Sequence, residues 1–67
     1  MKCWLGKLEG RNTLIVSQSK EHAAALLGIA PKDLDGWSKK VPPGWATANK
    51  VYVQSYDGWF EERSRDE

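Results

Sequence analysis

Apolar and polar residues alternate in two runs near the start of the chain, in residues 2–9 and 13–18. The second run is rich in β-branched side chains, which favour strands. Between the runs, Gly10, Arg11 and Asn12 supply turn chemistry, because glycine and asparagine tolerate a positive φ. The pattern therefore predicts an N-terminal β-hairpin with Arg11 in its turn. The first strand would be apolar or small on both faces, with Trp4, Gly6 and Leu8 on one and Cys3 and Leu5 on the other.

A run of good helix formers follows in residues 20–27. Ser19 is placed to cap its N-terminus, and Glu21 lies in the first turn near the positive end of the helix dipole. Gly28 falls at the left-handed position after the last turn, and Ile29 follows where a Schellman motif takes an apolar residue. We expect a helix over residues 20–27 whose core-facing side chains are those of Ala23, Leu26 and Leu27.

Residues 31–40 indicate a second, weaker helix. Pro31 suits a first helical turn because it needs no N–H there. Leu34 and Trp37 are three residues apart and would share one face. Gly36 weakens this helix by about 1 kcal/mol relative to alanine. The helix is therefore expected either to continue through residue 40 or to end just before Gly36 and leave Trp37 in a loop.

The last third of the chain predicts a loop and then one or two strands. Residues 41–49 contain a Pro-Pro-Gly sequence and would form a loop that lies over the core through Trp45. Residues 50–56 predict a third strand, and Asp57-Gly58 is a two-residue hairpin signal. Trp59 and Phe60 would then begin a short fourth strand. In the third strand, Val51 and Val53 would point inward and Tyr52 and Tyr56 to the other face.

This order of elements predicts an α+β fold, a small antiparallel sheet with two helices on one face. A chain of 67 residues allows one domain, expected over residues 1–60 with residues 61–67 as a charged tail. So short a chain buries only about 60% of its unfolded surface. That leaves little room for a deep substrate pocket, so we expect a binding module rather than an enzyme.

Charge and cysteine content bear on the class of protein and on the kind of partner it would bind. Ten Lys and Arg nearly balance nine Asp and Glu, although residues 1–50 are net basic and residues 51–67 net acidic. The basic part would mildly prefer an anionic partner. The single cysteine excludes an internal disulfide framework and a cysteine-rich zinc site. No apolar run approaches the roughly 20 residues that cross a bilayer, and no secretory leader opens the sequence, so a cytoplasmic location is expected.

The residue types that carry catalysis or bind cofactors show no arrangement in this sequence that is typical of such a site. Cys3 is interpreted as a small buried side chain and His22 as a solvated residue of a first helical turn, with no third group to orient them. Glu61 and Glu62 are adjacent, so on a strand they point to opposite faces. The sequence has no phosphate-binding glycine loop. We expect no catalytic residues, no metal and no cofactor.

Residues 22–37 resemble the helix-turn-helix of small excisionase- and MerR-type DNA-binding proteins. The matching positions are Ala23, Ala24, Leu26, Leu27, Gly28, Ile29, Leu34 and Trp37. In that family the second helix enters the major groove of DNA. The resemblance therefore implies DNA binding as one function, with Lys32, Lys39 and Lys40 on phosphates and Arg11 as a wing-like contact.

A second resemblance extends over most of the chain. Its layout is similar to that of small phage and prophage accessory proteins with a strand pair, an S-K-x-x-A-A-x-L-L-G-[IV] segment and a closing V-Y-V strand. The corresponding residues are Ser19, Lys20, Ala23, Ala24, Leu26, Leu27, Gly28, Ile29, Val51, Tyr52 and Val53. This resemblance implies a phage or mobile-element origin, and some such proteins inhibit host defence complexes, anti-CRISPRs among them.

Four tryptophans in 67 residues are many for a small domain. Some must stabilise a thin core, but tryptophan is also enriched at interface hot spots. We expect a binding protein that covers a surface of a host protein complex, with DNA as the alternative partner and a homodimer compatible with either. The expected contact residues are Trp45, Trp59, Tyr52 and Tyr56, with Lys39 and Lys40 as polar neighbours.

Overall fold

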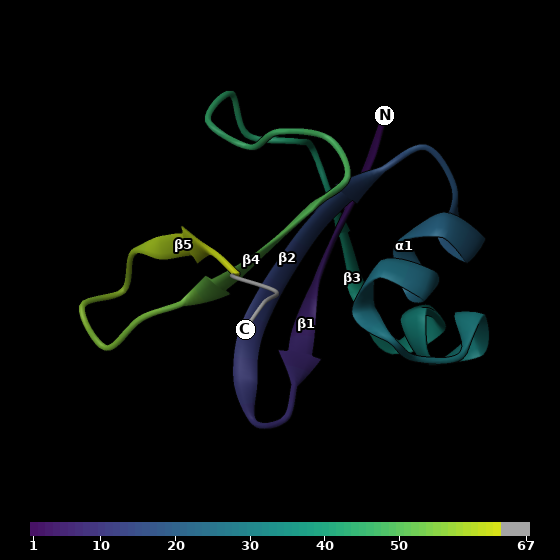
Figure 1. Cartoon of the computed structure of the whole chain (residues 1–67), viewed down its shortest axis with the longest axis horizontal. Coiled ribbons are helices and arrows are strands. Elements are labelled where there is room, and N and C mark those ends of the chain that lie inside the picture. The colour runs from purple at the N-terminus through teal and green to yellow at the C-terminus, as the bar shows by residue number, and fades with distance from the viewer. Residues whose placement is uncertain (64–67) are drawn as a thin grey trace.

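Five antiparallel strands form one sheet, which the computed structural model describes within residues 1–63 (Figure 1). The strand order is β3-β1-β2-β4-β5. The elements are β1 (Lys2–Leu8), β2 (Arg11–Ser17), the helix α1 (Lys20–Leu27), the 3-10 helix η1 (Pro31–Gly36), β3 (Ser38–Lys40), β4 (Lys50–Gln54) and β5 (Phe60–Glu62). Both helices lie on one side of the sheet, so the predicted α+β fold is confirmed (Figure 1).

The N-terminal hairpin forms as predicted, but its turn is tighter. β1 and β2 pair along their whole length, from Lys2 opposite Ser17 to Leu8 opposite Arg11. The two connecting residues, Glu9 and Gly10, have φ values of 55° and 80°. Two successive positive φ values give the turn that matches the twist of antiparallel strands. Arg11 is therefore the first residue of β2, and its prediction as a turn residue is wrong.

Both ends of α1 are formed as the sequence predicts. The Ser19 side chain accepts a hydrogen bond from the backbone N–H of His22 at 3.2 Å. Gly28 adopts φ 76°, and the next N–H, of Ile29, donates to the Ala24 carbonyl at 3.0 Å. The Schellman motif is confirmed, and these bonds satisfy end groups that have no partner within the helix.

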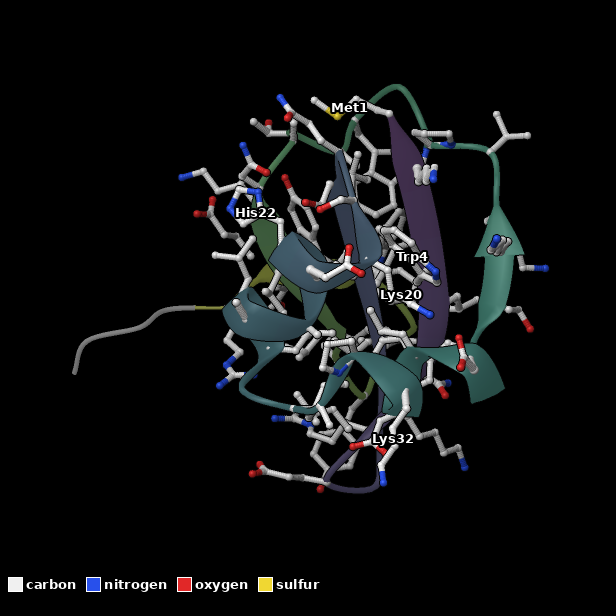
Figure 2. All side chains as sticks on the ribbon, turned by 90° about the vertical axis from the view of Figure 1, so that its right-hand side faces the viewer. Met1, Trp4, Lys20, His22 and Lys32 are labelled. Atoms are coloured by element: carbon white, nitrogen blue, oxygen red, sulfur yellow. The ribbon has the colours of Figure 1, made fainter. Side chains whose placement is uncertain are left out.

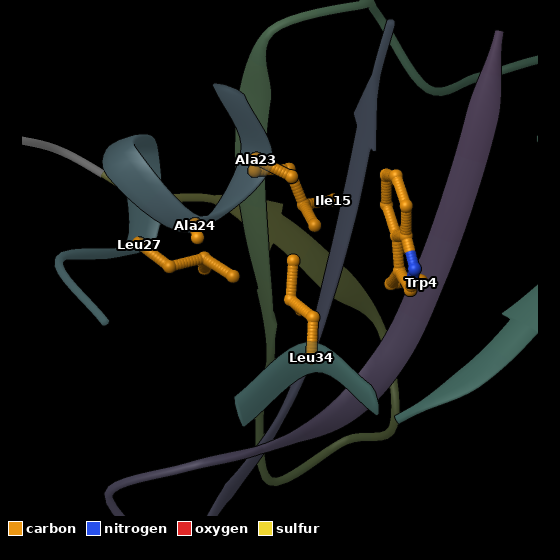
Figure 3. Close-up of a cluster of buried hydrophobic side chains, with 6 residues drawn as sticks. All are labelled: Trp4, Ile15, Ala23, Ala24, Leu27 and Leu34. Atoms are coloured by element: carbon orange, nitrogen blue, oxygen red, sulfur yellow. The ribbon is translucent and has the colours of Figure 1, made fainter. Parts of the chain in front are cut away.

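The main core lies between the helices and the sheet (Figure 3). Its buried members are Trp4, Ile15, Ala23, Ala24, Leu27 and Leu34. The two alanines allow α1 to approach the sheet closely, while Leu34 of η1 fills the space beside Trp4 of β1. Trp4 and Leu8 share the helix-facing side of β1, and Cys3 and Leu5 share the other side, which is the grouping that the alternation predicted.

The segment after Leu34 departs from the helix expected over residues 31–40. It forms a 3-10 helix that ends at Gly36, and residues 38–40 pair with β1 as the edge strand β3. Trp37 lies between them, half-buried, with its indole ring against the backbone of Gly6. Pairing with β1 satisfies backbone groups that a continued helix would bond, so the helix through residue 40 and the expected three or four strands are wrong. The alternative, a helix that ends near Gly36 and leaves Trp37 outside it, is confirmed.

A second, smaller cluster fills the opposite face of the sheet, under the loop of residues 41–49. It buries Cys3, Leu14, Val16 and Tyr52, with Ala46, Ala48 and Phe60 packed against them. Figure 1 shows this loop away from the helices, at the upper end of the sheet. Three hydrogen bonds attach the loop. The Thr47 N–H donates to the Tyr52 hydroxyl at 2.8 Å, the Asn49 N–H to the Val16 carbonyl at 2.7 Å, and the Ser17 hydroxyl to the Asn49 side-chain oxygen at 3.4 Å.

The C-terminal hairpin has a longer turn than the two residues predicted. Residues 55–59 connect β4 to β5, with Gly58 at φ 87° and the Ser55 N–H donating to the Trp59 carbonyl at 2.8 Å. Glu61 and Glu62 belong to β5, so the charged tail does not begin at residue 61 as expected. The rest of the predicted tail, residues 64–67, lies outside the described residues.

Candidate protein-binding surface

Three large aromatic side chains are exposed on the loop and hairpin away from the helices. The exposed fractions are 54% for Trp45, 74% for Trp59 and essentially complete for Tyr56. Phe60 is half-buried beside Trp59 in the chain and lies against Trp45. The contact of Trp45 with Phe60 joins the loop to the hairpin whose turn carries Tyr56 and Trp59, and we call these four residues together the aromatic surface. The remaining tryptophans differ, because Trp4 is buried and Trp37 half-buried.

Trp45 is held in place by two other rings. Its indole stacks on Phe60, with centroids 5.8 Å apart and ring planes 22° apart. It meets Tyr52 edge-on, with centroids 5.3 Å apart. Such pairs contribute about 0.5–1.5 kcal/mol each beyond the area they bury. Trp45 therefore presents one face to solvent in a fixed orientation, which lowers the entropy lost on binding.

Tyr52 is a supporting residue and not an exposed anchor. Only 7% of its surface is accessible, and its hydroxyl accepts the hydrogen bond from the Thr47 backbone. The prediction of Tyr52 as a contact residue is therefore wrong. Phe60, which stacks on Trp45, belongs to the aromatic surface instead of Tyr52. The sequence pattern placed Phe60 on a strand after the Asp-Gly turn but did not indicate it as a contact residue. The loop that covers Tyr52 is a tertiary feature that strand alternation does not reveal.

Tyr56 and Trp59 lie in the turn between β4 and β5, near the N-terminal hairpin. A hydrogen bond of 2.7 Å joins the Asn12 amide on β2 to Gln54 on β4. A shallow hollow of about 390 Å³ separates the two turns. Its lining residues are Gly10, Arg11, Asn12, Gln54, Ser55 and Tyr56. The structure thus brings Arg11, predicted for DNA, beside Tyr56, predicted for a protein partner.

The charges around the aromatic surface are mixed, because Arg11 lies beside Tyr56, Lys50 is on β4 and Arg63 directly follows β5. Asp57 lies in the same turn, and Glu61 and Glu62 are on β5. Lys50 forms a salt bridge with Glu62 at 3.0 Å, and this hydrogen-bonded carboxylate raises the pKa of Lys50. Because both groups are exposed, solvent screens the pair and it contributes little to stability. The three acidic and three basic side chains balance, so this surface offers a polyanion such as DNA no net attraction.

The predicted lysines lie elsewhere. Lys39 and Lys40 are on β3, at the opposite edge of the sheet from β5, so they are not neighbours of the aromatic surface. Because they are adjacent on a strand, they point to opposite faces. Lys32 is exposed on η1, at the other end of the helical layer from His22 (Figure 2). The four residues expected to bind DNA are therefore spread over separate parts of the molecule.

The segment in the position of a DNA-reading helix is short and partly acidic. η1 has six residues in 3-10 geometry, which makes poorer hydrogen bonds than an α-helix. Asp33 and Asp35 are both exposed on it, and Asp35 binds Lys20 at 3.0 Å. Their carboxylates would repel phosphates, whereas base and phosphate contacts mostly come from Arg, Lys, Asn and Gln.

The two candidate nucleophilic or basic groups are not placed for catalysis. Cys3 is buried with 1% of its surface accessible, as predicted, and burial raises the pKa of its thiol. A raised pKa disfavours the reactive thiolate. His22 is exposed in the first turn of α1. Within residues 1–63, no three His, Cys, Asp or Glu side chains are close enough to hold a metal ion.

Comparisons with known proteins add no assignment. Neither a scan against protein-family models nor searches of curated proteins and solved structures found a match to this chain. None of the helices in residues 1–63 is long and apolar enough to cross a membrane. The function must therefore be inferred from the surface itself.

Proposed function

We propose that this protein is a small, non-enzymatic binding protein that covers a surface of a host protein complex. The observation that carries the proposal is the aromatic surface, where Trp45, Tyr56 and Trp59 are exposed on one loop and one hairpin turn. Large aromatic side chains are costly to expose and are typical of interface hot spots. The burial of Cys3 and the separate position of His22 support a non-catalytic function.

A protein partner fits this surface better than a nucleic acid. Stacking on single strands needs aromatic rings interleaved with basic side chains. Here the acidic side chains of Asp57, Glu61 and Glu62 are balanced by those of Arg11, Lys50 and Arg63. The predicted Lys39 and Lys40 lie at the other edge of the sheet. The phage or mobile-element origin rests on the resemblance of the sequence, and inhibition of a defence complex, as by an anti-CRISPR, is the form of activity it favours.

The test is affinity capture from a bacterial lysate treated with nuclease. Wild-type protein is compared with a Tyr56→Ser/Trp59→Ser variant, whose changes lie at exposed positions and should leave the fold intact. A Glu21→Ser/Lys32→Ser variant is the matched control, because both side chains are exposed on the helical layer. We expect wild type and control to retain the same protein complex and the aromatic variant to lose it. Equal capture by all three would refute the assignment of this surface.

DNA binding is measured in parallel, by fluorescence polarisation with mixed duplex DNA at rising salt. We expect no strong binding at low salt. Binding with a steep salt dependence that weakens in a Lys39→Ala/Lys40→Ala variant would favour the helix-turn-helix alternative and overturn the proposal.

A further inference from the structure

The two outer strands of the sheet carry opposite charges. β3 has the sequence Ser-Lys-Lys and β5 has the sequence Phe-Glu-Glu, and each is three residues long. Within residues 1–63, β3 pairs with β1 alone and β5 with β4 alone. Each strand therefore directs a row of backbone N–H and C=O groups outward, where another chain can pair with it.

The charges on β3 are divided between the two faces of the sheet. Lys39 lies opposite Trp4, whose side chain is in the core under the helices. Lys40 lies opposite Cys3, which belongs to the cluster under the 41–49 loop. Lys39 is therefore on the helix face and Lys40 on the loop face.

The charges on β5 follow the same division. Glu62 lies opposite Tyr52, which is in the cluster under the loop, so Glu62 is on the loop face. Glu61 lies opposite Val53 and is on the helix face. Of these two glutamates, only Glu62 is in a salt bridge within residues 1–63, with Lys50.

We propose that copies of this chain associate head to tail, with β5 of one copy beside β3 of the next. When the helices of both copies lie on the same side of a continuous sheet, the two strands run in the same direction. In register, Lys39 then lies beside Glu61 on the helix face and Lys40 beside Glu62 on the loop face. Both pairs of opposite charges form at once, and the free backbone groups of both edges are satisfied.

The same charges disfavour a two-fold dimer through either edge. Pairing β3 with a second β3 brings lysines together, and pairing β5 with a second β5 brings glutamates together. Both arrangements are destabilising because like charges then lie opposite each other. The favoured contact uses two different surfaces, so it continues from copy to copy unless the rotation closes a ring. This inference does not rest on the proposed function, because its charge pairs involve none of the exposed rings Trp45, Tyr56 and Trp59, although Phe60 of the aromatic surface is on β5.

Sedimentation velocity of the purified protein tests the proposal. At low salt we expect the weight-average mass to rise with concentration beyond that of a dimer, and at about 0.5 M salt, where charges are screened within a few ångströms, to remain near that of a monomer. Wild type that stays monomeric at every concentration at low salt would overturn the proposal.

Charge reversal tests the pairing itself. Lys39→Glu/Lys40→Glu has two acidic edges, and Glu61→Lys/Glu62→Lys has two basic edges. Each variant alone should be monomeric, and their equimolar mixture should associate again. The control for the lysine variant is Lys7→Glu/Lys32→Glu. It changes the net charge by the same amount as Lys39→Glu/Lys40→Glu but at positions outside β3 and β5, so it should associate as wild type does.

Circular dichroism checks that each variant is folded. A single Glu61→Lys variant keeps the Lys50–Glu62 salt bridge and gives a second test of whether association needs the acidic charges of β5. A mixture that stays monomeric would overturn the edge pairing. Association that stops at a dimer, or that survives both reversals, would overturn it as well.

Discussion

Replacing Gly6 with alanine tests the contact between β1 and the segment after η1. Gly6 does not have a positive φ, so alanine would ordinarily stabilise this strand position by about 0.5–1 kcal/mol. However, a Cβ atom built on Gly6 overlaps the indole ring of Trp37. Forcing additional atoms into a packed site costs about 1–3 kcal/mol. The net effect should be a loss of about 1–2 kcal/mol, opposite in sign to the ordinary expectation.

Urea unfolding followed by circular dichroism measures this effect. The free energy of unfolding of a domain of this size falls by about 1 kcal/mol per molar urea, so the unfolding midpoint should fall by about 1–2 M. Gly36→Ala is the matched control, because Gly36 also lacks a positive φ and a Cβ there meets no atom within 4 Å. That variant should be as stable as wild type or slightly more stable.

A double-mutant cycle identifies the cause. In a Trp37→Ala background the obstructing ring is absent, so Gly6→Ala should no longer destabilise the protein. If Gly6→Ala is as stable as wild type, or costs the same with and without the Trp37 ring, the reasoning from this contact is refuted.

Three further predictions concern a helix cap, a loop attachment and a buried thiol. Ser19→Ala removes the side-chain acceptor for the His22 N–H and should cost about 1 kcal/mol in urea unfolding. Tyr52→Phe removes the partner of the Thr47 N–H and, because Thr47 is exposed, should cost about 0.5–1.5 kcal/mol, with faster hydrogen exchange at that amide. Because burial raises the pKa of Cys3, its thiol should react with a disulfide reagent at pH 8 far more slowly in the folded protein than in urea. The raised pKa also means that the unfolded thiol loses its proton first, so stability should fall as the pH rises through the ordinary thiol range and above.

Controls separate these effects from general damage. Ser19→Asp keeps a capping oxygen and should retain the stability of wild type. Cys3→Ala should remove the part of the alkaline loss that belongs to the thiol. An unchanged alkaline loss in Cys3→Ala would show that other groups cause it, and an unchanged exchange rate at Thr47 in Tyr52→Phe would show that the hydroxyl does not hold the loop.

Local signals predicted the elements that local chemistry determines. The hairpin strands and α1 follow from alternation and from the end residues Ser19 and Gly28, whose hydrogen bonds form within a few residues of sequence. The two faces of β1 were also predictable, because its apolar side chains alternate. In each case the decisive contacts are close in the chain.

The features that were missed depend on contacts distant in the chain. β3 has no apolar residue, so nothing in Ser-Lys-Lys predicts a strand, and β1 supplies the pairing that makes it one. The burial of Tyr52 depends on a loop without regular structure that folds back across the sheet. For the candidate site, Trp45, Tyr56 and Trp59 were predicted by residue type, whereas their separation from Lys39 and Lys40 required the strand order.

Trp45 closes the second cluster and, in the proposed function, also contacts the partner. A change at this position therefore alters folding and recognition together. Tyr56 and Trp59 are largely free of the interior, so under the proposed function changes there alter recognition alone. A protein with that function could follow a changing target by substitutions in the turn of residues 55–59, while Trp45 stays constrained by folding.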